Sequence, residues 1–104
     1  MWRLDRAWRT MRAAIPHLDR PPSEVIRERF WLTTQPFDSP ERDEFLPQLL
    51  EHLGMTDHIL FSSDYPHWDR DDPARILPAA IIGKEAREQI LRKNALRLFR
   101  FGGV

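Results

Sequence analysis

The chain has 104 residues and 16 basic side chains against 16 acidic ones, so its formal net charge at pH 7 is zero. This length excludes a complete closed (β/α)₈ barrel, which needs roughly 250 residues, and the absence of cysteine excludes disulfide scaffolds, thiolate catalysis and cysteine-based metal centres. No apolar run approaches the ~18 residues of a membrane span. The balanced charge creates no electrostatic field of one sign that would attract nucleic acid. We therefore expect a cytoplasmic protein that binds neither membranes nor nucleic acid.

The first thirty residues predict two helices. One ends near Pro16 and carries an apolar stripe formed by Leu4, Trp8, Met11 and Ile15. No capping residue precedes this helix, which favours the interpretation that the sequence once continued upstream. The other is a short helical turn over residues 23–29, for which Ser23 is the expected N-terminal cap.

A strand, a helix and a second strand are predicted to follow. Residues 30–34 and 59–63 are expected to be the strands, and the first of them lacks alternation, which suits a strand covered on both faces. Between them, Asp38 is the expected cap of a helix that Gly54 ends. A helix between two short strands predicts a parallel βαβ unit and therefore an α/β fold.

The rest of the sequence predicts a polar loop and further helices. Asp72 is the expected cap of a short helix that begins at Pro73 and that Pro78 interrupts. The last helix, about residues 84–99, places Asn94 on its inner side, where an amide more often ties down backbone than performs chemistry. No repeat or flexible linker divides the chain, so we expect one domain over residues 1–104.

Two parallel strands make an incomplete sheet. Each strand leaves an unpaired edge, and such edges favour association with other chains. We therefore expect the pattern to be a slice of a larger structure, or a module that associates with a second chain.

The most informative group of polar side chains follows the second strand directly, at residues 62–69 (Ser-Ser-Asp-Tyr-Pro-His-Trp-Asp). In α/β folds, chemistry is located at the carboxyl ends of the strands. Asp64 in this position can ligate a divalent metal or take a proton from water, or it can cap the following turn. His67 and Asp69 could complete a metal cluster with Asp64, but a loop histidine more often makes structural hydrogen bonds, and we expect Asp69 to be a solvated loop residue.

Four segments of the sequence carry a resemblance to a known family. They are residues 22–24 (Pro-Ser-Glu), 33–36 (Thr-Thr-Gln-Pro), 61–69 (Phe-Ser-Ser-Asp-Tyr-Pro-His-Trp-Asp) and the closing Asn94-Ala95 with Leu98-Phe99. Together they resemble the C-terminal portion of amidohydrolase family 2, the amidohydrolase-related proteins that include aminocarboxymuconate-semialdehyde decarboxylase-like enzymes. The resemblance covers essentially the whole chain. It implies the C-terminal slice of a distorted (β/α)₈ TIM barrel, with residues 30–34 as strand seven and 59–63 as strand eight.

The resemblance also implies a mononuclear divalent metal, usually zinc, and a small-molecule substrate. Asp64 would be a metal ligand or the base that activates water, and His67 would belong to the same active-site rim. The implied reactions are hydrolysis of C–N or C–O bonds, or non-oxidative decarboxylation of a cyclic or aromatic carboxylate. The sequence contains no His-x-His pair, which the family requires, so we expect the chain to be inactive without the missing N-terminal barrel part. The alternative is a non-enzymatic relic, or an assembly module that uses exposed strand edges.

Overall fold

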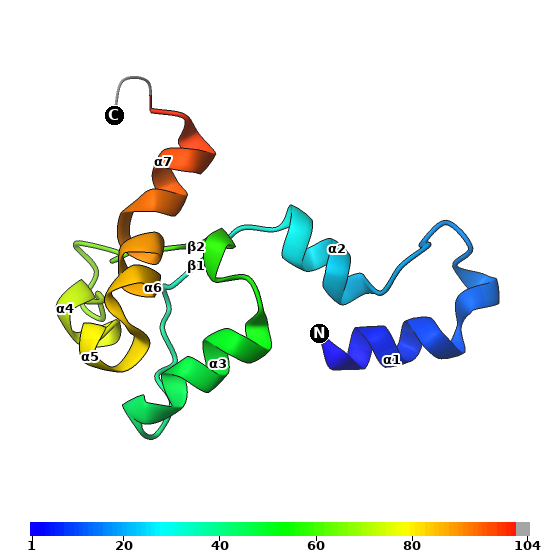
Figure 1. Ribbon diagram of the computed structural model, residues 1–104, viewed down its shortest axis with the longest axis horizontal. Coiled ribbons are helices and arrows are strands. Elements are labelled where there is room, and N and C mark those ends of the chain that lie inside the picture. Colours follow the sequence, from blue (N-terminus) through cyan, green and yellow to red (C-terminus); the bar gives the residue numbers. More distant parts are fainter. Residues whose placement is uncertain (102–104) are drawn as a thin grey trace. The chain divides into compact units, whose positions relative to one another are not determined.

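The computed structural model describes residues 1–101, which contain seven α-helices and one two-stranded sheet (Figure 1). The chain separates into two compact units, the first over Met1–Phe30 and the second beginning at Trp31. A single domain over residues 1–104 therefore stays a prediction. Among the described residues, no helix is both long enough and apolar enough to cross a membrane.

The first unit consists of α1 (Trp2–Thr10), a 3₁₀ turn (Arg12–Ala14) and α2 (Pro22–Arg29). α1 ends earlier than its apolar stripe predicts, at Thr10 rather than near Pro16. The hydroxyl of Thr10 donates hydrogen bonds to carbonyl oxygens in the preceding turn of the helix. Such local bonds compete with the regular helical ladder, and the chain continues as a tighter turn.

Hydrogen bonds join α1 to α2 and to the loop before it. The Asp5 carboxylate accepts from the Ser23 N–H (2.9 Å), and the indole N–H of Trp8 donates to the Leu18 carbonyl (2.9 Å). The prediction that Ser23 caps α2 is wrong, because the helix begins one residue earlier, at Pro22, and Ser23 is buried in its first turn. The fixed φ of proline suits the first helical position, and Asp5 supplies the acceptor that the helix N-terminus needs.

The second unit contains the sheet. β1 (Leu32–Thr33) and β2 (Ile59–Leu60) pair in parallel, with Leu32 opposite Ile59, which confirms the predicted βαβ order. Both strands are shorter than predicted, because within the described chain each has one neighbour and only two residue pairs form the ladder. β2 is buried but β1 is exposed, so the described residues alone do not cover the first strand on both faces as its sequence predicts.

The helix between the strands, α3 (Leu46–Leu53), follows a 3₁₀ turn (Asp43–Phe45). The predicted cap at Asp38 is wrong, because Asp38 lies in an irregular segment before that turn. A helix beginning near residue 38 would place Pro47 in its interior, where proline lacks the N–H that the ladder needs; in the structure Pro47 lies in the first turn. Gly54 ends α3 as predicted, with a left-handed φ of +64°.

The C-terminal part of the chain is helical. It contains α4 (Pro73–Ile76), α5 (Ala79–Ile82), α6 (Lys84–Glu88), a π-helical turn (Gln89–Lys93) and α7 (Asn94–Phe99), and α6 runs on into α7 (Figure 1). The predicted cap at Asp72 is confirmed, since its side chain accepts from the Ala74 N–H (2.9 Å). Pro78 separates α4 from α5, also as predicted.

The core of the second unit joins β2 to the last helices. Ile59, Leu77 and Ile90 are buried together. In the π-helical turn the Asn94 N–H bonds to the carbonyl five residues earlier. The carbonyl of Ile90 accepts a hydrogen bond from the Phe61 N–H (3.1 Å), just beyond the end of β2. The C-terminal helix therefore holds the strand from which the polar loop emerges.

Candidate functional site

Two residues that follow β1 hold the segment that follows β2. The Thr34 N–H donates to the Leu60 carbonyl (2.9 Å), and the Thr34 hydroxyl oxygen accepts from the Ser62 N–H (3.1 Å). The side-chain amide of Gln35 donates to the Asp69 carbonyl (3.3 Å). The carboxyl ends of both strands thus meet at one loop. Thr34 is buried. The sequence resemblance includes it in the segment 33–36 but assigns it no role, although a hydroxyl at the end of a predicted strand is a signal for this one.

Asp64 begins the turn of this loop. Its φ of +58° lies in the left-handed region, which aspartate tolerates better than most side chains. The carbonyl of Asp64 accepts from the His67 N–H (2.8 Å), and the carbonyl of Ser63 accepts from the Asp71 N–H (2.9 Å). The Tyr65 N–H bonds to the hydroxyl oxygen of Ser63 (3.3 Å). These bonds close the turn through backbone and serine groups, and the Asp64 carboxylate is about half exposed (54%).

His67 lies between two carboxylates. Its Nδ1 is hydrogen-bonded to Oδ1 of Asp69 and lies 3.8 Å from Oδ2 of Asp64. The hydrogen bond and charge of Asp69, and to a smaller extent the charge of Asp64, raise the pKa of His67. The same hydrogen bond lowers the pKa of Asp69. The expectation that Asp69 is merely a solvated residue is therefore corrected: it is exposed, but its carboxylate is engaged by the imidazole that lies two residues away.

The loop gathers a set of donor atoms that suits a cation. One ligand atom from each of Asp64, His67 and Asp69 lies within 4.8 Å of the others. Carboxylate oxygens and imidazole nitrogens are the donors that zinc and similar divalent ions take in proteins. The structure thus brings together the three residues that the sequence singled out, and their chemistry fits a divalent metal.

Exposed aromatic side chains surround these groups. Tyr65 is 74% and Trp68 87% exposed. The guanidinium carbon of Arg70 lies 5.7 Å from the ring centre of Tyr65, and the Trp68 ring lies 6.0 Å from the imidazole ring of His67. Flat apolar rings beside cationic groups are complementary to an aromatic or cyclic anion.

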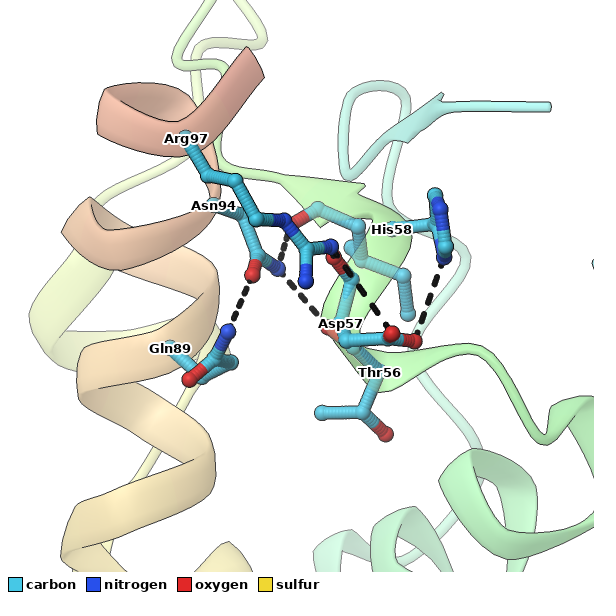
Figure 2. A network of polar contacts seen from close by, with 7 residues as sticks. Thr56, Asp57, His58, Gln89, Asn94 and Arg97 are labelled. Atoms are coloured by element: carbon cyan, nitrogen blue, oxygen red, sulfur yellow. Dashed lines mark hydrogen bonds and ion pairs between the residues drawn. The ribbon is translucent and has the colours of Figure 1, made fainter. Parts of the chain in front are cut away.

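A second polar network lies at the other end of β2, where the chain enters the strand (Figure 2). The buried side-chain amide of Asn94 donates to the carbonyls of Thr56 (2.8 Å) and Ile59 (2.7 Å) and accepts from the side chain of Gln89. The prediction that Asn94 ties down backbone is confirmed. Figure 2 shows the amide directed from the last helix towards the segment before β2.

Aromatic and charged side chains extend this network to β1. The guanidinium of Arg97 donates to the Asp57 carbonyl and lies 5.0 Å from the ring centre of Trp31, which precedes β1. The Trp31 ring in turn lies 4.4 Å from the ring of His58. The amino ends of both strands are therefore joined to α7, while their carboxyl ends carry the loop with Asp64.

Comparisons with known proteins agree with the sequence resemblance. A family model described as amidohydrolase matches residues 1–101. The gamma-resorcylate decarboxylase of Rhizobium sp. (strain MTP-10005) is 32% identical over 106 aligned residues, which cover 100% of this chain. The chain spans 31% of the length of that decarboxylase.

Proposed function

Because this chain belongs to the amidohydrolase family, we propose that it forms the C-terminal part of a metal-dependent enzyme, with β1 and β2 as strands seven and eight of a (β/α)₈ barrel. The enzyme would hydrolyse C–N or C–O bonds of a cyclic or aromatic carboxylate, or decarboxylate it without oxidation. The position of Asp64 carries this proposal. It follows a buried strand, in a turn that leaves its carboxylate exposed at the end where barrels hold their catalytic groups.

A divalent metal fits the side chains that follow β2, and amidohydrolases generally bind one. Asp64 would hold the ion, which is zinc in our proposal, together with ligands from the rest of the barrel. When bound, such an ion supplies Lewis-acid polarisation of a substrate oxygen. The carboxylate of Asp64 would either ligate such an ion or accept a proton from a water molecule.

The other groups of the loop would bind the substrate. When it is protonated, the imidazole of His67 can donate a hydrogen bond to a carboxylate, and the Arg70 guanidinium, which lies over the Tyr65 ring, adds positive charge to the same loop. Tyr65 and Trp68 offer exposed aromatic surface to a flat ring. Similarity to a decarboxylase whose name specifies an aromatic acid favours decarboxylation over hydrolysis for this chain.

The proposal requires the rest of the barrel, since the chain spans 31% of the length of the Rhizobium decarboxylase. Large apolar side chains are exposed on both units of the chain, among them Leu4, Phe30, Leu32, Phe45 and Leu49. An apolar cavity of about 120 Å³ also lies among β1, α3 and the core, lined in part by Leu32 and Leu49. Surfaces of this kind suit cover by further strands and helices, although the same surfaces suit an assembly module, which is the alternative.

Fusion with the remainder of a related barrel tests the proposal. The first two thirds of the Rhizobium decarboxylase would be joined to this chain, and the fusion assayed for bound metal and for decarboxylation of gamma-resorcylate. Asp64→Asn is the sharpest variant, because asparagine tolerates the left-handed φ of +58° but lacks the charge. We expect it to reduce turnover at least about 10²-fold and to reduce metal content.

Asp19→Asn is the matched control, since Asp19 is exposed and lies in the first unit. It should retain the metal content and turnover of the unmodified fusion. A fusion that binds metal and turns over substrate equally well with Asp64→Asn and Asp19→Asn would contradict the role of Asp64. A folded fusion with neither metal nor turnover would favour the non-enzymatic alternative.

A further inference from the structure

The two ring nitrogens of His67 have different surroundings. Nδ1 faces the loop, where Oδ1 of Asp69 binds it and Oδ2 of Asp64 lies 3.8 Å away. The imidazole ring is otherwise flanked by Trp68, and the His67 side chain is 54% exposed. The Nδ1 edge is thus occupied by protein, which leaves Nε2 as the nitrogen available to another molecule.

We propose that Asp69 is a positioning residue, which holds the Nδ1 edge of His67 so that Nε2 meets the substrate beside Asp64. The identity of the molecule that Nε2 meets rests on the proposed function, whereas the geometry of the pair rests on this chain alone. A carboxylate that accepts from one ring nitrogen fixes both the orientation of the ring and the site of its proton. Asp69 would therefore fix the orientation of the His67 ring and the nitrogen that carries its proton.

The backbone of the loop keeps the two partners in place. The Asp69 carbonyl accepts from the side chain of Gln35, which follows β1. The His67 N–H donates to the Asp64 carbonyl in the turn after β2. Asp69 is therefore anchored to one strand and His67 to the other, so the side-chain contact closes a link between the two strand ends.

This arrangement has a spectroscopic consequence. When the imidazole is neutral, its single proton should reside on Nδ1, since that nitrogen faces an acceptor-only carboxylate. A histidine without such a partner has no reason to prefer this tautomer.

Nitrogen-15 NMR of the histidine side chains tests the proposal on the 104-residue chain itself. Correlations between ring nitrogens and ring carbon-bound protons distinguish the Nδ1–H tautomer from the Nε2–H tautomer at a pH where the ring is neutral. A His67→Gln spectrum assigns the signal of His67 among the four histidines. In the unmodified chain we expect His67 to be the Nδ1–H tautomer. In Asp69→Ala the ratio of the Nδ1–H to the Nε2–H tautomer should fall roughly fivefold or more, because the variant loses one charge-assisted hydrogen bond that solvent partly screens.

Asp72→Ala is the matched control, because Asp72 lies in the same loop but caps α4 instead; it should leave the tautomer of His67 unchanged. If Asp69→Ala does not fold, Asp69→Asn replaces it, since it keeps the side-chain volume but lacks the charge, and the same direction of change is expected. An Nε2–H tautomer of His67 in the unmodified chain would overturn the proposal, as would an unchanged ratio in a folded Asp69 variant. The tautomer of His67 is measured without metal or turnover. The NMR result can therefore support the role of Asp69 even if the fusion is inactive, and it can contradict that role even if the fusion is active.

Discussion

Replacing Asn94 removes a buried side chain that joins the last helix to the strand before the candidate site. The side chain has an exposed fraction of 0%, and its amide nitrogen donates to the carbonyls of Thr56 (2.8 Å) and Ile59 (2.7 Å). In Asn94→Ala both carbonyls lose their donor. In Asn94→Asp the shape of the side chain is retained, but a carboxylate oxygen replaces the amide nitrogen beside two carbonyl oxygens.

The cost follows from the burial of these groups. A buried acceptor left without a donor costs about 1–3 kcal/mol. The Ile59 carbonyl is buried with Asn94 and the Thr56 carbonyl only in part, so we expect Asn94→Ala to lower the free energy of unfolding by about 2–4 kcal/mol. Asn94→Asp should cost at least as much at pH 7, because a buried charge facing acceptors adds repulsion. Losses of this size are a large part of the total stability of a small domain, typically ~5–15 kcal/mol.

Urea denaturation followed by circular dichroism measures the change, and exchange of the Phe61 amide hydrogen locates it. That amide donates to the Ile90 carbonyl beside the π-helical turn, so its protection should fall along with the global stability. Arg92→Ala is the control, since Arg92 is exposed on the same helical segment and its loss should change stability by less than about 0.5 kcal/mol.

The comparison of the two Asn94 variants separates the effect of side-chain shape from the effect of the donated hydrogen bonds. If shape alone made Asn94 important, Asn94→Asp would be close to the unmodified chain and Asn94→Ala would not. Asn94→Asp within about 0.5 kcal/mol of the unmodified chain would refute the claim that the two donated hydrogen bonds stabilise this end of β2.

Three further outcomes are expected. Hydrogen bonds from Ser23 lower the pKa of Asp5, so the stability that Asp5 contributes is present above the ordinary aspartate value of 3.8 and is lost as the pH falls through the lower folded pKa. Circular dichroism of the helices should show this loss as the pH is lowered. The Asp5→Asn substitution should abolish the loss in a Glu28→Gln background, which is needed because Arg20 also lowers the pKa of Glu28. Gly54→Ala should cost about 1 kcal/mol in urea denaturation, because a φ of +64° strains an L-residue. Light scattering after size-exclusion chromatography should give a mass above the 12.4 kDa of one chain. The Leu49→Glu substitution on the exposed apolar surface should lower this mass. A monomer at every concentration would show that this surface needs no partner.

The sequence by itself determined the order of the elements and the place of the candidate site. Strand composition and the helical spacing between the strands were sufficient for a parallel βαβ unit, because side-chain shape and periodicity act locally. Gly54 and Asp72 were assigned correctly for the same reason, since a helix end depends on a few neighbouring backbone groups. The segments at residues 22–24, 33–36, 61–69 and 94–99 indicated the family, because a family resemblance depends on particular side chains at fixed positions in the sequence.

Only the tertiary structure decided which groups are hydrogen-bonded to each other. Asp5 rather than Ser23 caps α2, although the two residues lie 18 positions apart, and no local pattern specifies such a partner. The length and cover of β1 depend on how many strands lie beside it, which is a property of the whole sheet. In the same way, the contact between Asp69 and His67 arises because the loop is held at both strand ends, by Gln35 after β1 and by the Asp64 turn after β2.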